Sequence, residues 1–192
     1  MAKLYFKYGT MGSSKTAQAL ITKFNYEERG MKTVLLKPAI DTRDGKNLCT
    51  SRIGLSATAT EVDKNQDLYQ LLKDTATDVV IVDECQFLTE DQVDQLDKIV
   101  LERNIPVLCF GLRADFLTHL FPGSKRLFEI ADSISEIKYI CQCGNKAIVN
   151  ARLDEQGNVV TEGSQVLIGG NDKYVAMCRK CWYKKIREQK KQ

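Results

Sequence analysis

Histidine is almost absent from this sequence: the chain of 192 residues contains one, at position 119. The nucleophiles of the common serine and cysteine triads and dyads are activated by a neighbouring imidazole. A single histidine makes such a site a poor explanation of the sequence, and we interpret His119 as a partly buried loop residue. The chemistry of this chain has to come from other residue types.

Long apolar runs are missing as well. No stretch approaches the roughly 20 apolar residues that span a bilayer, and the first residues enter a strand-like segment without the apolar core of a secretory signal. The excess of positive charge is only +3, and its concentration near residues 184–191 is typical of a solvated helix tail. We therefore expect a cytoplasmic protein with no membrane partner and no nucleic-acid partner.

What the sequence does contain, near its start, is a stretch of small residues at 9–16 between an expected strand, 4–8, and an expected helix, 17–24. A small-residue loop that ends in Lys-Thr in this setting is typical of a phosphate-binding P-loop. Loop amides and the helix N-terminus would surround a polyphosphate, Lys15 would reach its outer phosphates, and the Thr16 hydroxyl would ligate magnesium. The alternative is an ordinary strand-to-helix turn with a surface lysine.

A second motif follows four branched apolar residues at 79–82, a pattern that fits a strand covered on both faces in a parallel sheet. Asp83 and Glu84 come directly after it, at the end where open α/β sheets bind ligands. Beside a P-loop, Asp83 would hold magnesium, and Glu84 could take the proton from an attacking hydroxyl or water. The alternative is an acidic pair that caps a strand on a solvated edge.

The other elements follow from hydrophobic periodicity and turn residues. We expect strands at 33–37, 106–110 and 133–140 and helices at 65–74, 89–104 and 125–132. Thr89 and Gln92 form a capping box at the start of the second of these helices. The small polar residues at 44–60 indicate a mobile loop. Alternation of strands and helices predicts a three-layer α/β domain, followed by a smaller unit with too little apolar content to hold itself together.

Seven cysteines in a reducing compartment are not interpreted as disulfides. Three are scattered and are assigned to apolar packing, whereas the other four form two close pairs: Cys141, Cys143, Cys178 and Cys181. Four thiolates complete a tetrahedral zinc site and leave no position open, which indicates a structural metal. Bound zinc contributes about 10–16 kcal/mol to small units of this kind. The alternative is four buried free cysteines.

Two further segments carry less specific signals. Arg43 lies in a turn rich in aspartate and glycine, where it is either a turn residue or a side chain that faces the phosphates. Residues 166–174, between the cysteine pairs, contain two glycines and then an aromatic residue. Such a segment lets the backbone approach a flat ligand closely, although it could equally form a hairpin.

Taken together, these motifs resemble the zinc-containing type II thymidine kinases. The matching segments are 8–11, 83–87, 111–116, the two cysteine pairs and 168–174, and they run in family order from residue 5 to about residue 182. The resemblance implies transfer of the ATP γ-phosphoryl group to the 5′-hydroxyl of thymidine, giving dTMP in nucleotide salvage, with deoxyuridine as a poorer substrate. It also implies a homotetramer and feedback inhibition by dTTP.

The resemblance also implies roles for individual residues. Glu84 would be the general base, and Thr16 and Asp83 would hold Mg²⁺. The residues expected to bind ATP are Gly9, Thr10, Met11, Gly12, Ser13, Ser14, Lys15, Thr16, Arg43, Asp83 and Arg113. Those expected to bind thymidine are Met11, Gln86, Phe87, Leu112, Phe116, Asn150, Leu167, Ile168, Gly169, Gly170 and Tyr174. In the family the glycine-rich segment is a lasso that closes over the base, and Asn150 falls where many relatives have threonine near the thymine methyl.

Two positions depart from the family pattern. Ser14 replaces the second P-loop glycine, and a left-handed backbone there would be less favourable for serine. The one-residue gap between Cys141 and Cys143 is shorter than that of most members. One rival function is a nucleic-acid-stimulated ATPase with a zinc-bearing binding domain, against which the weak net charge argues. Another is a zinc-stabilised nucleotide sensor without catalysis.

The sequence thus predicts an α/β fold with a P-loop NTPase (RecA-like) core, a parallel central sheet and a small zinc-binding lasso domain. We expect residues 1–140 to form the nucleotide-binding domain and residues 141–192 the zinc-binding and lasso domain.

Overall fold

A parallel sheet forms the centre of the computed structural model, which describes residues 1–40, 45–165 and 173–190. The sheet has six strands in the order β5-β2-β6-β7-β1-β8, and each of these neighbouring pairs is parallel. In chain order the strands are β1 (Leu4–Gly9), β2 (Thr33–Pro38), β5 (Thr60–Val62), β6 (Val79–Val82), β7 (Val107–Leu112) and β8 (Ser133–Ile137). The predicted parallel central sheet is confirmed.

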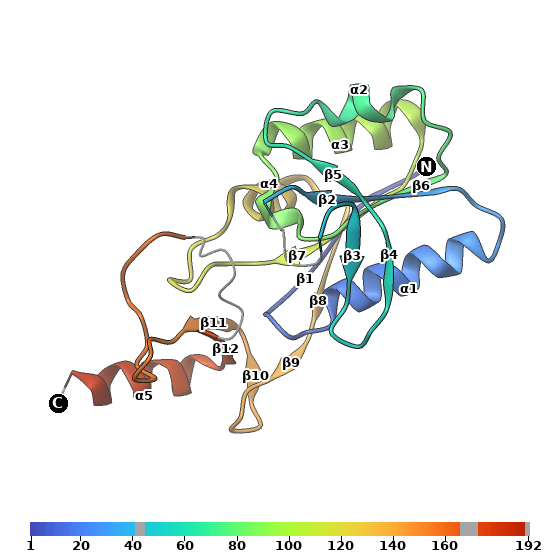
Figure 1. Cartoon of the computed structure of the whole chain (residues 1–192). Coiled ribbons are helices and arrows are strands. Elements are labelled where there is room, and N and C mark those ends of the chain that lie inside the picture. The colour runs from blue at the N-terminus through green and yellow to red at the C-terminus, as the bar shows by residue number, and fades with distance from the viewer. Residues whose placement is uncertain (41–44, 166–172, 191–192) are drawn as a thin grey trace.

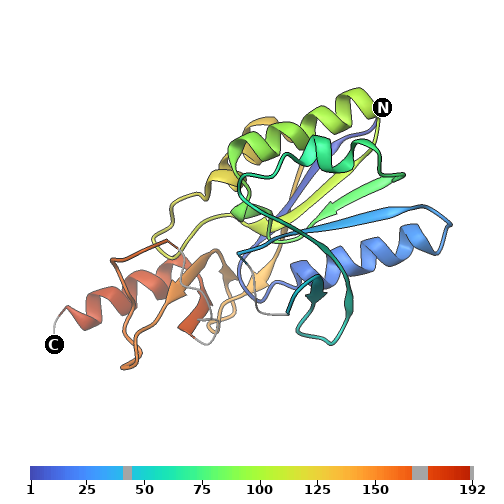
Figure 2. The same ribbon diagram turned by 45° about the horizontal axis from the view of Figure 1, so that its top comes forward.

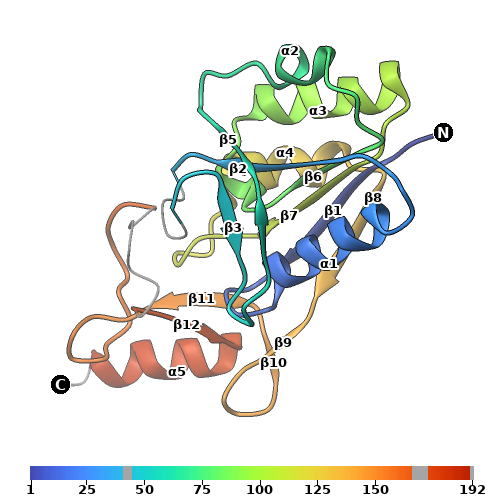
Figure 3. The ribbon, with the colours of Figure 1, turned by 45° about the vertical axis from the view of Figure 1, so that its right-hand side comes forward.

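Helices cover both faces of this sheet, as Figures 1 and 3 show. One face is covered by α1 (Lys15–Glu27) and the other by α2 (Leu68–Lys73), α3 (Glu90–Arg103) and α4 (Pro122–Ile130). Val79 and Ile81 of β6 pack in the core on the α1 side, whereas Val80 and Val82 pack in the core on the α3 side. Because side chains alternate along a strand, an uninterrupted apolar run fills both layers.

Local capping fixes where α3 begins. The Thr89 hydroxyl accepts the main-chain N–H of Gln92, and the Gln92 side chain accepts the N–H of Thr89 in return, which confirms the predicted capping box. α4 begins at Pro122, earlier in the chain than the predicted start near residue 125. Proline is favoured in the first turn of a helix because its missing N–H has no partner there.

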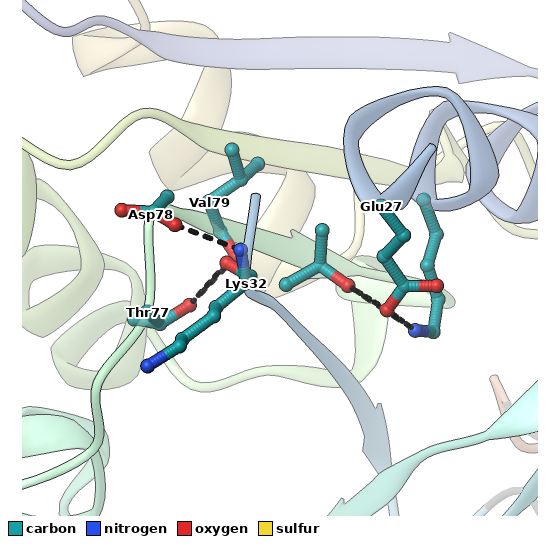
Figure 4. A network of polar contacts seen from close by, with 7 residues as sticks. Glu27, Lys32, Thr77, Asp78 and Val79 are labelled. Carbon is teal, nitrogen blue, oxygen red and sulfur yellow. Dashed lines mark hydrogen bonds and ion pairs between the residues drawn. The ribbon is translucent and has the colours of Figure 1, made fainter. Parts of the chain in front are cut away.

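A polar network ties the end of α1 to the starts of β2 and β6, at the edge of the sheet where these strands begin (Figure 4). The Asp78 carboxylate accepts the Lys32 N–H at 2.7 Å, and the Thr77 hydroxyl lies 3.2 Å from the Lys32 carbonyl. Glu27, the last residue of α1, accepts a hydrogen bond from the Thr33 hydroxyl at 2.6 Å. These bonds fix the positions of α1, β2 and β6 relative to one another at the end of the sheet that lies away from the P-loop.

The prediction of a mobile loop at 44–60 was wrong for most of that segment. Residues 48–58 form an antiparallel hairpin of β3 (Leu48–Thr50) and β4 (Ser56–Thr58), and β5 then joins the edge of the main sheet. The Lys37 ammonium, almost fully buried at the end of β2, donates to the Leu48 carbonyl at 3.0 Å and holds the hairpin down. Strands of three residues are too short for an alternating pattern to show in the sequence.

A second, smaller unit adjoins the edge of the sheet where β1 and β7 end and α1 begins (Figures 1 and 2). It contains the pairs β9 (Tyr139–Ile140) with β10 (Lys146–Ala147) and β11 (Val149–Arg152) with β12 (Tyr174–Met177), followed by α5 (Arg179–Gln189). The strand expected at 133–140 is therefore divided between β8 and β9. The apolar cluster of β11 and α5 is small and consists of Val149, Ala151, Val159 and Trp182.

No helix in the described ranges has the length and apolar character needed to cross a membrane.

Candidate active site

The P-loop joins β1 to α1 and is shaped by contacts that leave no room for larger residues. A Cβ on Gly9 would lie 2.3 Å from the Ser13 hydroxyl oxygen and 2.8 Å from the Ile137 carbonyl. Gly12 has φ of 82°, the left-handed region that glycine tolerates. The Lys15 side chain turns into the loop, where its ammonium donates to the Thr10 carbonyl at 2.7 Å. Lys15 is only 7% exposed, so the alternative of a turn with a surface lysine is excluded.

Ser14 adopts the left-handed conformation that its position demands. Its φ of 62° and ψ of 26° place it at the N-cap of α1 without a side-chain capping bond. A residue with a Cβ pays roughly 1–2 kcal/mol in this region relative to glycine. The sequence departure at this position therefore costs backbone energy while the loop still forms.

Asp83 lies at the end of β6 next to Thr16 and is 3% exposed. Burial and then the charge of Glu84 raise the pKa of Asp83 to about 6, against the opposing effects of a Thr16 hydrogen bond, a Cys49 hydrogen bond and the Lys15 charge. The two residues predicted to hold magnesium are thus in contact. The Asp83 Oδ1 atom is buried and has no hydrogen-bond partner among the described residues, which fits a cation ligand.

Glu84 begins the short helix η1 (Cys85–Phe87) and has φ of 51°, a second non-glycine residue in the left-handed region. Its carboxylate accepts a hydrogen bond from the Gln86 side-chain amide. The side-chain oxygen of Gln86, Oε1, in turn accepts the Leu112 N–H at 2.9 Å, and Gln86 is fully buried. A Cβ on Gly111 would lie 2.6 Å from this Gln86 oxygen. Gln86 therefore orients Glu84 against the end of β7, and backbone strain at Glu84 is typical of a functional position.

Asn150, on β11, joins the P-loop to the chain that follows β7. Its Oδ1 accepts the Met11 N–H at 2.8 Å, and its Nδ2 donates to the Ala114 carbonyl at 2.9 Å. The side chain is 4% exposed. The structure thus gives Asn150 a protein-bridging role besides the thymine contact expected for it.

Arg113 lies near the start of the P-loop. Together with Gly9 and Thr10 it lines a small, partly open pocket, and its Nη2 is 3.4 Å from the Ile148 carbonyl. Arg113 therefore lies beside the first residues of the P-loop, and its expected contact with phosphates stays a prediction. Arg43, also expected near the phosphates, lies outside the described residues.

Two of the aromatic residues expected around the nucleoside, Phe87 and Phe116, follow the ends of β6 and β7, and the third, Tyr174, lies on β12. Phe87 packs edge-on against Phe121 with ring centroids 5.7 Å apart. Phe116 is 1% exposed and lies under the guanidinium of Arg152 at 3.8 Å. Tyr174, half-buried, opens β12 opposite Arg152. The expected ligands Leu167, Ile168, Gly169 and Gly170 lie outside the described residues.

The four cysteines predicted to bind zinc come together. All four sulfur atoms lie within 4.8 Å of one another, and Cys143 Sγ is 3.6 Å from Cys178 Sγ. Zn–S bonds of about 2.3 Å in a tetrahedron place the sulfurs about 3.8 Å apart. Cys143 is exposed, so the four cysteines are not all buried as the alternative required, and their arrangement is compatible with a structural zinc site. The short gap between Cys141 and Cys143 therefore does not prevent the cluster from forming.

N–H groups favour the thiolate of Cys143, whereas hydrogen bonds with Cys143 and Cys178 raise the pKa of Cys181 to about 12. Hydrogen bonds from the main chain and side chain of Asn145 lower the pKa of Cys143 to about 6. The Asn145 amide lies 3.2 Å from Cys143 Sγ, and the Cys181 N–H lies 3.4 Å from Cys178 Sγ. Gly144, with φ of 86°, forms the turn that brings these groups together. Such N–H donors are expected around a structural zinc site.

Sequence reasoning missed three groups at the site. The Cys49 thiol, assigned to apolar packing, lies 3.4 Å from Asp83 Oδ2. The buried Arg152 side chain stacks on Phe116, and Gln165 donates to Asp115 at 3.0 Å. None of these residues stands in a local motif, because their partners lie far away in the sequence.

The whole chain resembles one family of known proteins. A family model described as thymidine kinase matches residues 2–182. The thymidine kinase of Yersinia pestis is 46% identical over 191 residues, which is 97% of each chain. That of Legionella pneumophila subsp. pneumophila, strain Philadelphia 1, is 50% identical over 93% of this chain and 88% of its own length. A crystal structure of a DNA replication initiation factor covers 71% of this chain and 40% of that chain, with 14% identity and a TM-score of 0.41, too distant a likeness to bear on function.

Proposed function

The chain belongs to the thymidine kinase family and phosphorylates thymidine, and we propose that Glu84 is the general base that activates the 5′-hydroxyl toward the γ-phosphoryl group of ATP. The observation that carries this proposal is the meeting of Lys15, Thr16, Asp83 and Glu84 at one end of the sheet. Glu84 and Lys15 are both close enough to Asp83 to influence its pKa, in opposite directions. A base and a phosphate-binding cation therefore flank one buried carboxylate.

On the donor side, we assign the amides of residues 9–16 and the N-terminus of α1 to the phosphates of ATP. Lys15 would exchange its contact with the Thr10 carbonyl for the outer phosphates. Thr16 and Asp83 would hold Mg²⁺, for which the buried Asp83 Oδ1 supplies an oxygen without another partner in the described chain. The bound ion would neutralise charge on the phosphates.

On the acceptor side, Glu84 would take the 5′-hydroxyl proton on its carboxylate. The Gln86 amide holds that carboxylate and is itself held by the Leu112 N–H. Gln86 would thus fix the direction in which Glu84 accepts the proton, in addition to the substrate contact expected from the resemblance. Transfer by a positioned base typically accelerates such a step about 10²–10⁴-fold.

For the nucleoside, we propose a pocket walled by Met11, Phe87, Leu112, Phe116 and Tyr174. An apolar enclosure excludes water, which would otherwise compete with the sugar as the phosphoryl acceptor. The thymine methyl in such a pocket is worth roughly 1–3 kcal/mol. Deoxyuridine is therefore expected to be a poorer substrate that is still accepted.

The cysteine cluster supports a structural Zn²⁺ held by Cys141, Cys143, Cys178 and Cys181. Four protein ligands leave no open coordination position, so the metal would stabilise the small unit without entering the reaction. Among the described residues no disulfide joins any of the seven cysteines, which fits the reducing conditions of the cytoplasm that we propose as the location.

We also propose feedback inhibition by dTTP and a homotetramer. The Met11–Asn150 bond places the P-loop directly beside the segment that carries Ala114 and Phe116. A thymidine nucleotide with its own triphosphate could therefore occupy the nucleoside pocket and the phosphate cradle at once. Assembly is supported by Ile21 and Phe24 of α1, whose apolar side chains are 46% and 62% exposed.

The test is a nucleoside panel incubated with Mg·ATP and analysed for nucleoside 5′-monophosphate and ADP. We expect thymidine to give equal amounts of dTMP and ADP, and deoxyuridine to react with a lower kcat/KM. A parallel reaction contains single-stranded DNA in place of nucleoside. ADP release that depends on DNA and not on thymidine would contradict the proposal in favour of a nucleic-acid-stimulated ATPase.

A further inference from the structure

We propose that Arg152 is a positioning residue of the nucleoside pocket, one that holds Phe116 and residues 162–164 in the arrangement that binds thymidine. The proposal rests on the function proposed above, because it takes Phe116 as a wall of that pocket. Arg152 is the last residue of β11 and is 8% exposed. A side chain with a permanent charge is costly to bury, so its contacts have to account for its place.

The first contact is with the Phe116 ring. The guanidinium carbon of Arg152 lies 3.8 Å from the ring centroid, within the range of a cation–π interaction. Phe116 is itself 1% exposed. The guanidinium lies over the ring, and the ring cannot move in that direction without displacing it.

The second contact is with the main chain of residues 162–164. Nη2 of Arg152 donates to the Glu162 carbonyl at 3.2 Å, and Nη1 donates to the Ser164 carbonyl at 3.2 Å. The planar fork of arginine suits two acceptors in fixed directions, which a lysine ammonium cannot match. Between the two carbonyls is Gly163, where a Cβ would lie 2.6 Å from Nη2. The chain therefore closes tightly around the guanidinium.

Neighbouring contacts show that this end of β11 aligns a whole segment. Asn150, two residues before Arg152 and hence on the same face of the strand, binds the Ala114 carbonyl. Arg152 binds Phe116, two residues after Ala114. Asp115, between them, accepts a hydrogen bond from Gln165 at 3.0 Å. Three side-chain contacts at consecutive positions thus hold residues 114–116 against β11 and residues 162–165.

The chemistry of these contacts argues against a role as core filling. Within the described part of the chain, the Arg152 guanidinium meets two carbonyls and a ring rather than a carboxylate. Methionine would fill a similar volume without the cost of burying a charge. What arginine adds is direction: it fixes the ring plane and two carbonyls relative to one another.

The experiment compares Arg152→Met and Arg152→Lys with the wild-type enzyme. Each variant is assayed for kcat, for KM of thymidine and of ATP, and for thymidine affinity by isothermal titration calorimetry. Zinc content and thermal unfolding report on folding. We expect Arg152→Met to raise KM and Kd for thymidine about tenfold, with kcat and the KM for ATP within about twofold, since loss of preorganisation weakens binding. The KM and Kd of Arg152→Lys for thymidine should lie between those of the wild-type enzyme and those of Arg152→Met.

The matched control is Arg103→Met. Arg103, at the end of α3, also donates to two main-chain carbonyls, those of Leu72 and Thr75, but lies far from the pocket. We expect this variant to lose stability without a change in thymidine KM. The proposal is overturned if Arg152→Met leaves thymidine KM at the wild-type value. It is also overturned if Arg152→Met and Arg103→Met raise thymidine KM equally.

A second variant keeps the test decisive if Arg152→Met does not fold. Gly163→Ala retains Arg152 but introduces a methyl group 2.6 Å from Nη2, at a residue whose φ of 123° favours glycine, so it displaces the carbonyls from the guanidinium. It should raise thymidine KM in the same selective way, and an unchanged KM would contradict the proposal. Failure of the wild-type enzyme to phosphorylate thymidine would instead contradict the proposed function, so the two failures are distinguishable.

Discussion

The main-chain N–H of Met11, in the P-loop, donates a 2.8 Å hydrogen bond to the side chain of Asn150, 139 positions later in the chain. The same side chain donates to the Ala114 carbonyl, in the loop that follows β7. One buried amide therefore joins the P-loop, the proposed nucleoside side of the site and β11 of the small unit. The geometry of the site depends on how firmly that unit is held.

Replacement of Asn150 by alanine should loosen all three parts at once. The Met11 N–H and the Ala114 carbonyl would lose their partners, and an unsatisfied buried polar group costs about 1–3 kcal/mol. We expect the free energy of unfolding to fall by about 2–4 kcal/mol and KM to rise for both substrates. Urea unfolding and steady-state kinetics measure these effects. Asn158→Ala, at a half-buried residue just after the turn at 155–157, is the control, and equal losses in both variants would contradict the bridging role.

Replacement of Glu84 by glutamine tests the assignment of the base. The amide keeps the size of the side chain but cannot accept the hydroxyl proton, so kcat should fall about 10²–10⁴-fold. Thymidine affinity, measured by calorimetry, should stay within about threefold of the wild-type value, because proton transfer adds nothing to ground-state binding.

Glu90→Gln is the control for this charge change. Glu90 lies on the first turn of α3 with an exposed side chain, and its substitution should leave turnover unchanged. Wild-type turnover in Glu84→Gln would remove Glu84 as the base.

Removal of zinc should unfold the small unit. The apolar cluster of β11 and α5 is small, whereas structural zinc contributes about 10–16 kcal/mol. We expect Cys178→Ser to lose the metal and helix content by circular dichroism, with thymidine KM raised through the loss of the Asn150 contacts. Cys49→Ser, outside the cluster, should retain one zinc per chain by elemental analysis. A metal-free variant with an intact circular-dichroism spectrum would show that zinc is dispensable.

The elements that could be predicted are those whose signals are local. Four branched residues before Asp83 identify a doubly covered strand, Thr89 and Gln92 identify a helix start, and the spacing of the cysteine pairs identifies the cluster. The strand, the helix start and each cysteine pair depend on neighbours within a few positions, although Cys143 and Cys178 of the two pairs are 35 positions apart. The same locality explains why the P-loop and the acidic pair were found but their contact, Thr16 to Asp83, had to come from the fold.

What could not be predicted depends on partners distant in the chain. The hairpin at 48–58 is held by Lys37 and contributes mainly Cys49 to the core, too little to produce an apolar pattern. Arg152 appears in the sequence as one more charged residue, and only the return of residues 162–164 to β11 encloses it. The thiol of Cys49 resembles that of any packed cysteine until the fold brings it to Asp83.

Replacement of Ser14 by glycine measures how much the departure from the P-loop pattern lowers the free energy of unfolding. Relief of the left-handed backbone, with φ of 62°, should gain roughly 1–2 kcal/mol, of which the greater freedom of glycine in the unfolded chain removes about 0.5–1 kcal/mol. The expected net result is a small rise in the free energy of unfolding, measured by urea titration, with kcat/KM for ATP within about twofold of the wild-type value. Thr118→Gly relieves a similar strain at φ of 69° away from the P-loop and should also stabilise the protein. A tenfold loss of kcat/KM confined to Ser14→Gly would mean instead that the Ser14 hydroxyl contacts the phosphates, and serine at this position would then be a ligand rather than a tolerated substitute for glycine.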